Sequence, residues 1–137
     1  KTEAESKGAD EAILTNPDGS VSEGSAENIF LVIANQLHTP SLDQNILEGI
    51  TRNTVIELAQ KELGIATVQR KIMAGELAAA DEVFLTGTGA EVAPVTKING
   101  AKVGSGCIGP IARKLQDMYF QIVRGQNPKY AHWLSKI

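Results

Sequence analysis

The sequence has one cysteine, few aromatic residues and no excess of positive charge. Because Cys107 is the single cysteine, no disulfide can form within the chain; this fits a reducing compartment, and we expect the thiol to be packed. Phe, Trp and Tyr make up only 4% of residues, so the core must be mostly aliphatic. The net charge of −3 argues against nucleic acid as a partner. No apolar run could span a bilayer and no signal-peptide pattern opens the chain, so we expect a cytoplasmic protein with no membrane partner.

The length and composition fit one globular unit, and we expect residues 1–137 to form a single domain. The chain has 137 residues, of which 42% are hydrophobic and 21% charged. Residues 1–7 read as a polar helical tract that Gly8 would end. The tract lacks an initiator Met and looks like the last turns of a longer helix, so we expect the chain to be a piece of a longer protein.

Short apolar runs alternate with turn signals such as Asn16-Pro17-Asp18-Gly19. They predict an α/β chain of the mixed α+β kind, with an antiparallel-rich sheet flanked by helices. The first strands should form a β-meander, and the last two a hairpin around Asn99-Gly100. We expect strands at residues 11–14, 21–25, 28–34, 37–39, 66–70, 82–86, 92–98 and 101–103, and helices at residues 51–63, 74–80 and from 110 to near 125.

The motif Gly49-Ile50-Thr51-Arg52 lies at the start of the first long expected helix. A helix start has backbone N–H groups without intrahelical partners, and the helix dipole favours negative charge there. Gly49 lets a ligand approach the backbone closely, and Thr51 adds a hydroxyl donor. The motif therefore predicts an anion site. An ordinary helix start with Thr51 as its cap is the alternative.

A second run of small residues, Thr86-Gly87-Thr88-Gly89-Ala90, connects two expected strands. A tight turn of this kind can direct two N–H groups at one point and form a concave anion site, to which Thr88 would add its hydroxyl. A plain connecting loop is the alternative. Two such motifs in one small chain suggest a single anion site built from both, suited to a phosphate and a carboxylate.

Glu23 lies on a short expected strand beside Gly24. A carboxylate held near a pyridine nitrogen favours the protonated ring, and the protonated ring makes pyridoxal phosphate an electron sink. Together with the two anion sites, Glu23 indicates a pyridoxal-phosphate enzyme. For Glu23 alone, the alternative is a solvated carboxylate among sixteen acidic residues.

Several segments, read in order, closely resemble the class IV aminotransferases, which are fold-type IV pyridoxal-phosphate enzymes. The resemblance covers nearly the whole chain and implies their large C-terminal, cofactor-binding domain, with a β pseudo-barrel. Within the class, the turn and the C-terminal segments are most similar to branched-chain amino acid aminotransferases. The segments that carry the resemblance are Gly8–Leu14, Val21–Phe30, Ile46–Arg52, Ala80–Glu91, Gly109-Pro110, Tyr119-Phe120, Val123–Gly125 and His132–Leu134.

The resemblance implies a cofactor role for five residues. Glu23 would pair with the pyridine nitrogen, and Leu47 would lie against the ring. The backbone N–H groups of Ile50 and Thr51 would hold the phosphate, joined by the hydroxyl of Thr88. The expected cofactor is pyridoxal 5′-phosphate, and no metal ligand is expected.

The resemblance also assigns the substrate side of the site. The N–H groups of Thr88 and Gly89 would bind the α-carboxylate of the substrate. Many family members have Ala where this chain has Gly89, a change that keeps the N–H group. The Schiff-base lysine of the family is expected upstream of Lys1, together with a smaller N-terminal domain. We therefore expect no catalytic residue in this chain, and a fragment that is inactive alone.

The implied activity is transamination of leucine, isoleucine or valine with 2-oxoglutarate, so the expected partners are amino acids and 2-oxo acids. The intact enzyme is expected to be a homo-oligomer, a dimer or higher. A D-amino-acid aminotransferase or an aminodeoxychorismate lyase would share the scaffold and is the alternative within the family. A non-catalytic phosphate-binding domain is the alternative from another class.

Overall fold

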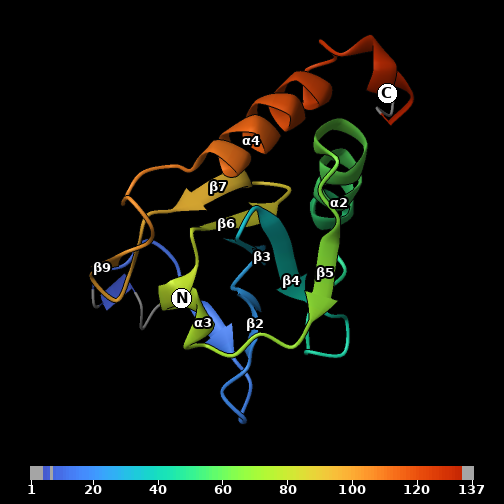
Figure 1. Cartoon of the computed structure of the whole chain (residues 1–137). Helices are drawn as coiled ribbons and strands as arrows, with labels where there is room; N and C mark the ends of the chain where they lie inside the picture. The colour runs from blue at the N-terminus through green and yellow to red at the C-terminus, as the bar shows by residue number, and fades with distance from the viewer. Residues whose placement is uncertain (1–4, 7, 134–137) are drawn as a thin grey trace.

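A computed structural model describes residues 5–6 and 8–133 (Figure 1). Glu5 and Ser6 are helical, and Gly8, with φ of 82°, donates its N–H to the carbonyl of Glu5 as the expected C-cap. The rest of the expected 1–7 tract, and Leu134 of the tail, lie outside the described residues. The elements are β1 (Ile13–Thr15), β2 (Val21–Gly24), β3 (Asn28–Ile33), β4 (Gln36–Pro40), α2 (Ile50–Leu63), β5 (Thr67–Arg70), α3 (Glu76–Ala79), β6 (Glu82–Gly87), β7 (Glu91–Val95), β8 (Lys97–Ile98), β9 (Ala101–Lys102), α4 (Pro110–Val123) and the 3₁₀ segment η1 (Pro128–Trp133).

A mixed sheet of five strands forms the centre of the fold, in the order β5-β4-β3-β6-β7. Its pairs are antiparallel except for β4 with β5, which run parallel because α2 connects them. β1 pairs with β2, and β8 with β9, in two separate antiparallel ribbons. The predicted antiparallel-rich sheet flanked by helices is confirmed.

The predicted meander and the predicted strand at residues 92–98 are each only partly right. The N–H of Gly24 donates to the carbonyl of Glu27 at 2.7 Å, which closes a turn that sends β3 into a different sheet from β2. The chain also leaves the main sheet after Val95, so that residues 92–95 pair with β6 and only Lys97-Ile98 enters the hairpin. The Asn99-Gly100 turn itself is confirmed, with φ of 50° and 83°.

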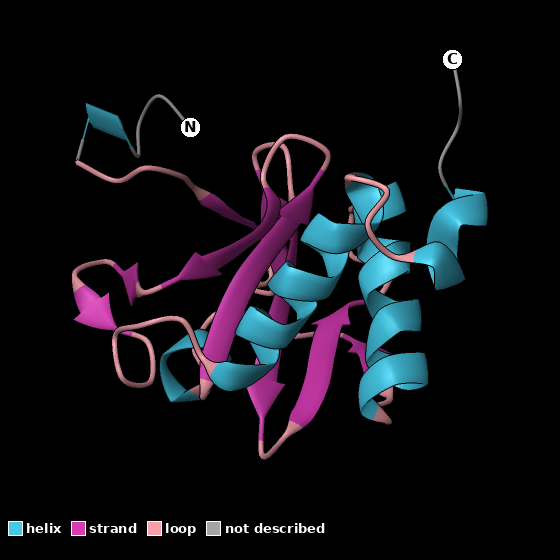
Figure 2. Ribbon diagram, turned by 90° about the horizontal axis from the view of Figure 1, so that it is seen from above, coloured by secondary structure: helices cyan, strands magenta, loops and turns pink. Residues whose placement is uncertain are grey.

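The strand β3 is buried on both faces, and its alternating side chains divide the core in two. Phe30 and Val32 face α2 and α4, and the Phe30 ring stacks on that of Phe84 with centroids 5.1 Å apart. Ile29 and Leu31 face the β1-β2 ribbon and α3. Figure 2 shows α2 and α4 together over one face of the sheet. This burial on both faces explains the unbroken apolar run of the sequence.

Both long helices begin and end near the expected residues. α2 starts after Gly49 and ends at Gly64, which has φ of 65° and satisfies the carbonyl of Ala59. α4 starts at Pro110. Proline has no backbone N–H, and it is tolerated here because the N–H of the first helical residue would have no intrahelical partner. The expectation that Cys107 is packed is wrong: it lies exposed, in the glycine-rich lead-in to α4. No helix among the described residues is long and apolar enough to cross a bilayer.

The buried carboxylate of Glu82, at the start of β6, caps α4. It accepts hydrogen bonds from the N–H groups of Ile111 at 3.3 Å and Ala112 at 2.9 Å. A negative charge there also complements the helix dipole. Gly109 leaves room for this contact, since a Cβ on it would lie 2.0 Å from the Cδ of Glu82.

We predict that Glu82→Ala lowers the free energy of unfolding by roughly 1–3 kcal/mol, because two buried N–H groups lose their acceptor. Glu82→Gln keeps one acceptor oxygen and should cost less. Urea denaturation followed by circular dichroism measures both, with Asp117→Asn on the exposed side of α4 as the control. Equal stability of wild type and Glu82→Ala would show that the cap contributes nothing.

Arg70 on β5 links the strand to α3 and to β4. Its guanidinium forms a bidentate pair with Glu76, with N–O distances of 2.7 and 3.2 Å, and its Nε donates to Nδ1 of His38 at 3.1 Å. Burial and the Arg70 charge lower the pKa of His38, which keeps its imidazole neutral as an acceptor. The hydrogen bond from Arg70, together with that from the N–H of Met73, lowers the pKa of Glu76 below its ordinary 4.5.

Because the pKa of Glu76 is lowered on folding, the unfolded chain binds that proton more tightly than the folded chain does. The pair therefore stabilises the fold fully above the unfolded pKa of 4.5, and this stabilisation is lost as the pH falls through the lower folded pKa. We predict that Glu76→Gln flattens the loss of stability below pH 4.5. Chemical denaturation at a series of pH values checks this, and parallel profiles for the two proteins would contradict it.

Candidate functional site

The predicted site residues gather at one end of the central sheet. β3 begins at Asn28 and β6 ends at Gly87, and because these strands are antiparallel, Asn28 lies opposite Thr86. A Cβ on Gly87 would lie 3.1 Å from the carbonyl oxygen of Ala26, so the end of β6 also lies close to the turn before β3. The end of β6 therefore lies beside the start of β3, and the segment before α2 reaches the same place because Leu47 binds the side chain of Asn28.

The side chain of Asn28 holds the segment before α2 in place. Its Nδ2 donates to the carbonyl of Leu47 at 2.8 Å and to Oε2 of Glu23 at 3.4 Å. Oε2 of Glu23 accepts the N–H of Leu47 at 3.1 Å. A Cβ on Gly49 would lie 2.3 Å from Oδ1 of Asn28, so a larger residue there would displace the Asn28 amide. Glu23 and Leu47, predicted on separate motifs, thus share one hydrogen-bonded cluster.

Asn28 was missed from the sequence. It is only 6% exposed and stands at the first position of an apolar strand, where a polar side chain needs a partner. That mismatch was the available signal. The partner itself was not foreseeable, because the Leu47 carbonyl lies 19 residues away in an irregular segment.

The start of α2 leaves its first backbone N–H groups open. Gly49 has an extended backbone, with φ of −69° and ψ of 143°, and the helix has no side-chain cap. The N–H groups of the first turn, at Ile50, Thr51 and Arg52, therefore lack intrahelical partners. Leu47 and Ile50 flank them with side chains that are 78% and 83% exposed. This arrangement can bind an anion that carries an apolar body.

The hydroxyl of Thr51 does not lie where the sequence predicts it, as a donor to the ligand. The residue is only 3% exposed, and its hydroxyl lies 3.2 Å from the phenol oxygen of Tyr119 on α4. The hydroxyl is therefore directed into the helix interface, and the backbone N–H of Thr51 is left as its group at the open helix end. The alternative of Thr51 as a helix cap is also wrong, because the N-cap position belongs to Gly49.

Residues 88–90 form the tight turn between β6 and β7, with Thr88 and Gly89 both exposed. Glu91 follows with φ of 57°, and its carboxylate pairs with Arg124, the residue that follows α4, at 3.0 Å. At the base of the turn, the buried hydroxyl of Thr86 has no hydrogen-bond partner among the residues that the structure describes. The end of β6 thus carries one buried hydroxyl that the described residues do not satisfy.

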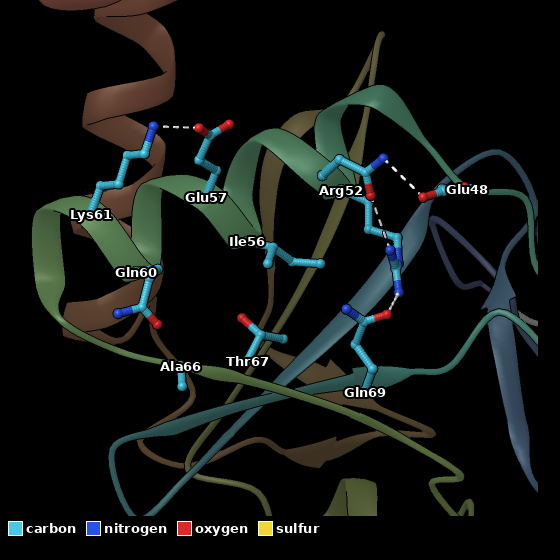
Figure 3. A pocket seen from close by; sticks show the side chains of 10 residues that line it. Glu48, Arg52, Ile56, Glu57, Gln60, Lys61, Ala66, Thr67 and Gln69 are labelled. Carbon is cyan, nitrogen blue, oxygen red and sulfur yellow. Dashed lines mark hydrogen bonds and ion pairs between the residues drawn. The ribbon is translucent and has the colours of Figure 1, made fainter.

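A separate hollow of about 480 Å³ lies between α2 and β5 (Figure 3). Arg52 points across it toward β5 and donates to Oε1 of Gln69 at 2.8 Å and to the carbonyl of Pro40 at 3.4 Å. Burial lowers the pKa of this guanidinium, although the charge of Glu48 opposes the shift. Arg52 therefore ties α2 to β4 and β5.

The sequence matches the model of the family described as amino-transferase class IV over residues 1–98. The chain therefore belongs to the class IV aminotransferases, which confirms the resemblance read from the motifs. A relative from Aquifex aeolicus, named "Probable branched-chain-amino-acid aminotransferase", is 53% identical over 137 residues. The match covers 100% of this chain and 44% of that protein.

Solved structures agree with the fold. The branched-chain amino acid aminotransferase of Thermobaculum terrenum in its PLP form superposes with a TM-score of 0.94 at 41% identity, over 98% of this chain and 44% of that one. The branched-chain aminotransferase of Thermoproteus uzoniensis, solved with norvaline, gives a TM-score of 0.92 at 47% identity, over 98% and 44%. The chain thus spans less than half the length of these relatives.

We predict that Asn28→Ala frees the segment before α2, because the Leu47 carbonyl loses its partner and the Glu23 carboxylate loses a neighbour. The amide hydrogen of Leu47 should exchange about tenfold faster or more, with a loss of roughly 1–3 kcal/mol in the free energy of unfolding. Hydrogen exchange followed by NMR measures the first, and Gln60→Ala on the exposed side of α2 is the control. Unchanged protection of Leu47 would mean that Asn28 does not hold this segment.

Proposed function

We propose that residues 1–137 form the cofactor-binding domain of a branched-chain amino acid aminotransferase that uses pyridoxal 5′-phosphate. The reaction would move an amino group between leucine, isoleucine or valine and 2-oxoglutarate. The observation that carries the proposal is the open N-terminus of α2 beside the Glu23–Leu47–Asn28 cluster. The names of the relatives from Aquifex aeolicus, Thermobaculum terrenum and Thermoproteus uzoniensis support the same activity.

The residues present fit the cofactor. The uncapped first turn of α2 offers N–H donors from Ile50 and Thr51 to a phosphate, and the dipole of a 14-residue helix adds to the attraction. The exposed side chain of Leu47 offers an apolar surface to a ring. The carboxylate of Glu23 is oriented by the N–H of Leu47 and lies beside the same segment. When bound, pyridoxal phosphate supplies an electron sink for the carbanion formed at the substrate Cα.

Each residue of this chain has a distinct task in the proposal. Glu23 keeps the pyridine nitrogen protonated, because a nearby negative charge stabilises the cationic ring. The hydroxyl of Thr88 joins the phosphate donors, and the N–H groups of Thr88 and Gly89 receive the substrate carboxylate. These tasks bind and orient, and the lysine that moves the proton is proposed to come from the segment that precedes Lys1.

A cytoplasmic location and assembly into a homodimer or larger oligomer belong to the same proposal, and they rest on the family resemblance. Amino acids and 2-oxo acids are the proposed substrates. The side-chain pocket that selects among them is proposed to be built from the preceding domain. For this reason the choice of substrate is tested on the longer protein rather than on this chain.

We predict that this chain binds pyridoxal phosphate and is stabilised by it, and that Glu23→Gln and Thr88→Val each weaken binding about fivefold to tenfold. The loss follows from removing one charge-assisted hydrogen bond in each variant. Titration followed by absorbance and by thermal unfolding measures the dissociation constant. Glu57→Gln, on a partly buried site of α2 outside the cluster, is the matched control.

The outcomes separate the alternatives. Binding of phosphate without preference for pyridoxal phosphate would support a non-catalytic phosphate-binding domain. Cofactor binding by this chain, with a longer protein that accepts D-alanine in place of L-leucine, would support a D-amino-acid aminotransferase. Equal affinity of wild type, Glu23→Gln and Thr88→Val would contradict the proposed roles of both residues.

A further inference from the structure

Tyr119 on α4 forms a hydrogen bond to the first turn of α2, 68 residues away in the sequence. The phenol oxygen lies 3.2 Å from Oγ1 of Thr51. Thr51 is almost fully buried, and the aromatic ring of Tyr119 packs against the apolar core beneath the two helices. The contact thus joins the two helices at a partly buried position.

The hydroxyl of Thr51 is unusual for a threonine in this helix. A threonine side chain in a helix often donates to the carbonyl four residues earlier. Thr54, one turn further on, does so, with its hydroxyl 3.0 Å from the carbonyl oxygen of Ile50. The equivalent carbonyl for Thr51 belongs to Leu47, and it accepts the amide of Asn28 instead. The side chain of Thr51 is directed to α4.

Side-chain contacts with other elements hold the first turn of α2: Arg52 binds Gln69 and Pro40 in the sheet, and Thr51 binds Tyr119 on α4. Gly49 supplies no side-chain cap, and glycine gives this point of the backbone more freedom than any other residue would. The segment is held before Gly49, where Asn28 binds Leu47, and again after it, where Tyr119 binds Thr51. The N–H group of Ile50 lies between these two residues, Leu47 and Thr51, and that of Thr51 belongs to the second.

α4 is itself held rigidly enough to serve as a support. Glu82 caps its first turn, and Arg124 at its end pairs with Glu91. One turn before Tyr119, Nε2 of Gln116 donates to the carbonyl of Val92 on β7 at 2.9 Å. Gln116 and Tyr119 are three residues apart and so lie on the same side of the helix. The helix α4 therefore contacts both halves of the anion site, the start of α2 and the strand that follows residues 88–90.

We propose that Tyr119 is a positioning residue for the phosphate site: through Thr51, it fixes the first turn of α2 so that the N–H groups of Ile50 and Thr51 point at one phosphate. The inference rests on the proposed function, since it concerns the same cofactor. In this proposal Tyr119 acts through its bond to Thr51 and not by contact with the phosphate or the reacting atoms. A preorganised turn binds an anion more tightly because less conformational entropy is lost on binding.

The test measures the affinity of this chain for pyridoxal phosphate and for inorganic phosphate in wild type, Tyr119→Phe, Thr51→Val and the double variant. Tyr119→Phe should weaken both ligands by the same factor, about threefold to tenfold, because only the phosphate donors are affected. Thr51→Val should have a similar effect. The double variant should be no weaker than Thr51→Val alone, since the two residues act through one bond. Thr51→Ser keeps the hydroxyl and should restore the affinity.

Tyr130→Phe is the matched control. The phenol of Tyr130 is also buried and hydrogen-bonded, to Glu62, and it lies at the other end of α2. This variant should lower the melting temperature and leave both affinities unchanged. The ³¹P chemical shift of the bound phosphate should move in Tyr119→Phe and stay constant in Tyr130→Phe, which separates positioning from general stability.

Two failures can be told apart. If wild type binds both ligands and Tyr119→Phe binds them equally well, the role of Tyr119 is overturned and the proposed function stands. The same holds if the effects of Thr51→Val and Tyr119→Phe simply add. If wild type binds neither ligand, the proposed function fails in this chain, and the role of Tyr119 falls with it.

Discussion

The geometry of the site depends on the amide of one buried side chain, that of Asn28. Its bond to the Leu47 carbonyl helps to fix an irregular segment that lies outside the helices and strands. The same amide lies beside the carboxylate of Glu23, which in turn accepts the N–H of Leu47. A buried polar group of this kind is costly to leave unsatisfied, so the segment has one strongly preferred position. From that position Gly49 leads directly into the open start of α2.

Side chains in the first turn of α2 then fix the position of the helix start. Thr51 is bound by Tyr119 on α4, and Arg52, the next residue, binds Gln69 on β5 and Pro40 on β4. Successive residues of one turn are thus tied to α4 and to the sheet, while the helix start has no side-chain cap on its backbone N–H groups. The turn at residues 88–90 joins the same end of the fold because β3 and β6 pair in register. We propose that the two predicted anion sites act as one because these elements hold them at the same end of the fold.

Local signals in the sequence predicted the elements well. Gly64 and Pro110 gave the limits of α2 and α4, and Asn99-Gly100 gave the hairpin, because each residue has a backbone preference that acts within a few positions. The strand order was not predictable in this way. Nothing local tells that β4 pairs in parallel with β5, or that β2 leaves the sheet of β3. Those choices follow from which faces can be buried together.

The site, too, was predictable where the signal is local and not where it depends on the fold. The motifs identified Glu23, Leu47, Ile50, Thr51, Thr88 and Gly89 as candidates, since each lies in a run with a chemical meaning of its own. They did not identify Asn28 or Tyr119, because a residue that orients another has no signature until the fold brings the two together. The hydroxyl of Thr51 was assigned to the ligand for this reason, whereas the structure directs it to Tyr119.

The central claim is that the start of α2 and the turn after β6 form one anion site in this chain. It is tested most directly by mapping amide chemical-shift changes while the chain is titrated with pyridoxal phosphate. The account predicts that the amides of Ile50, Thr51, Thr88 and Gly89 shift together with a single dissociation constant. Shifts confined to the hollow around Arg52, or separate constants for the helix start and the turn, would contradict it.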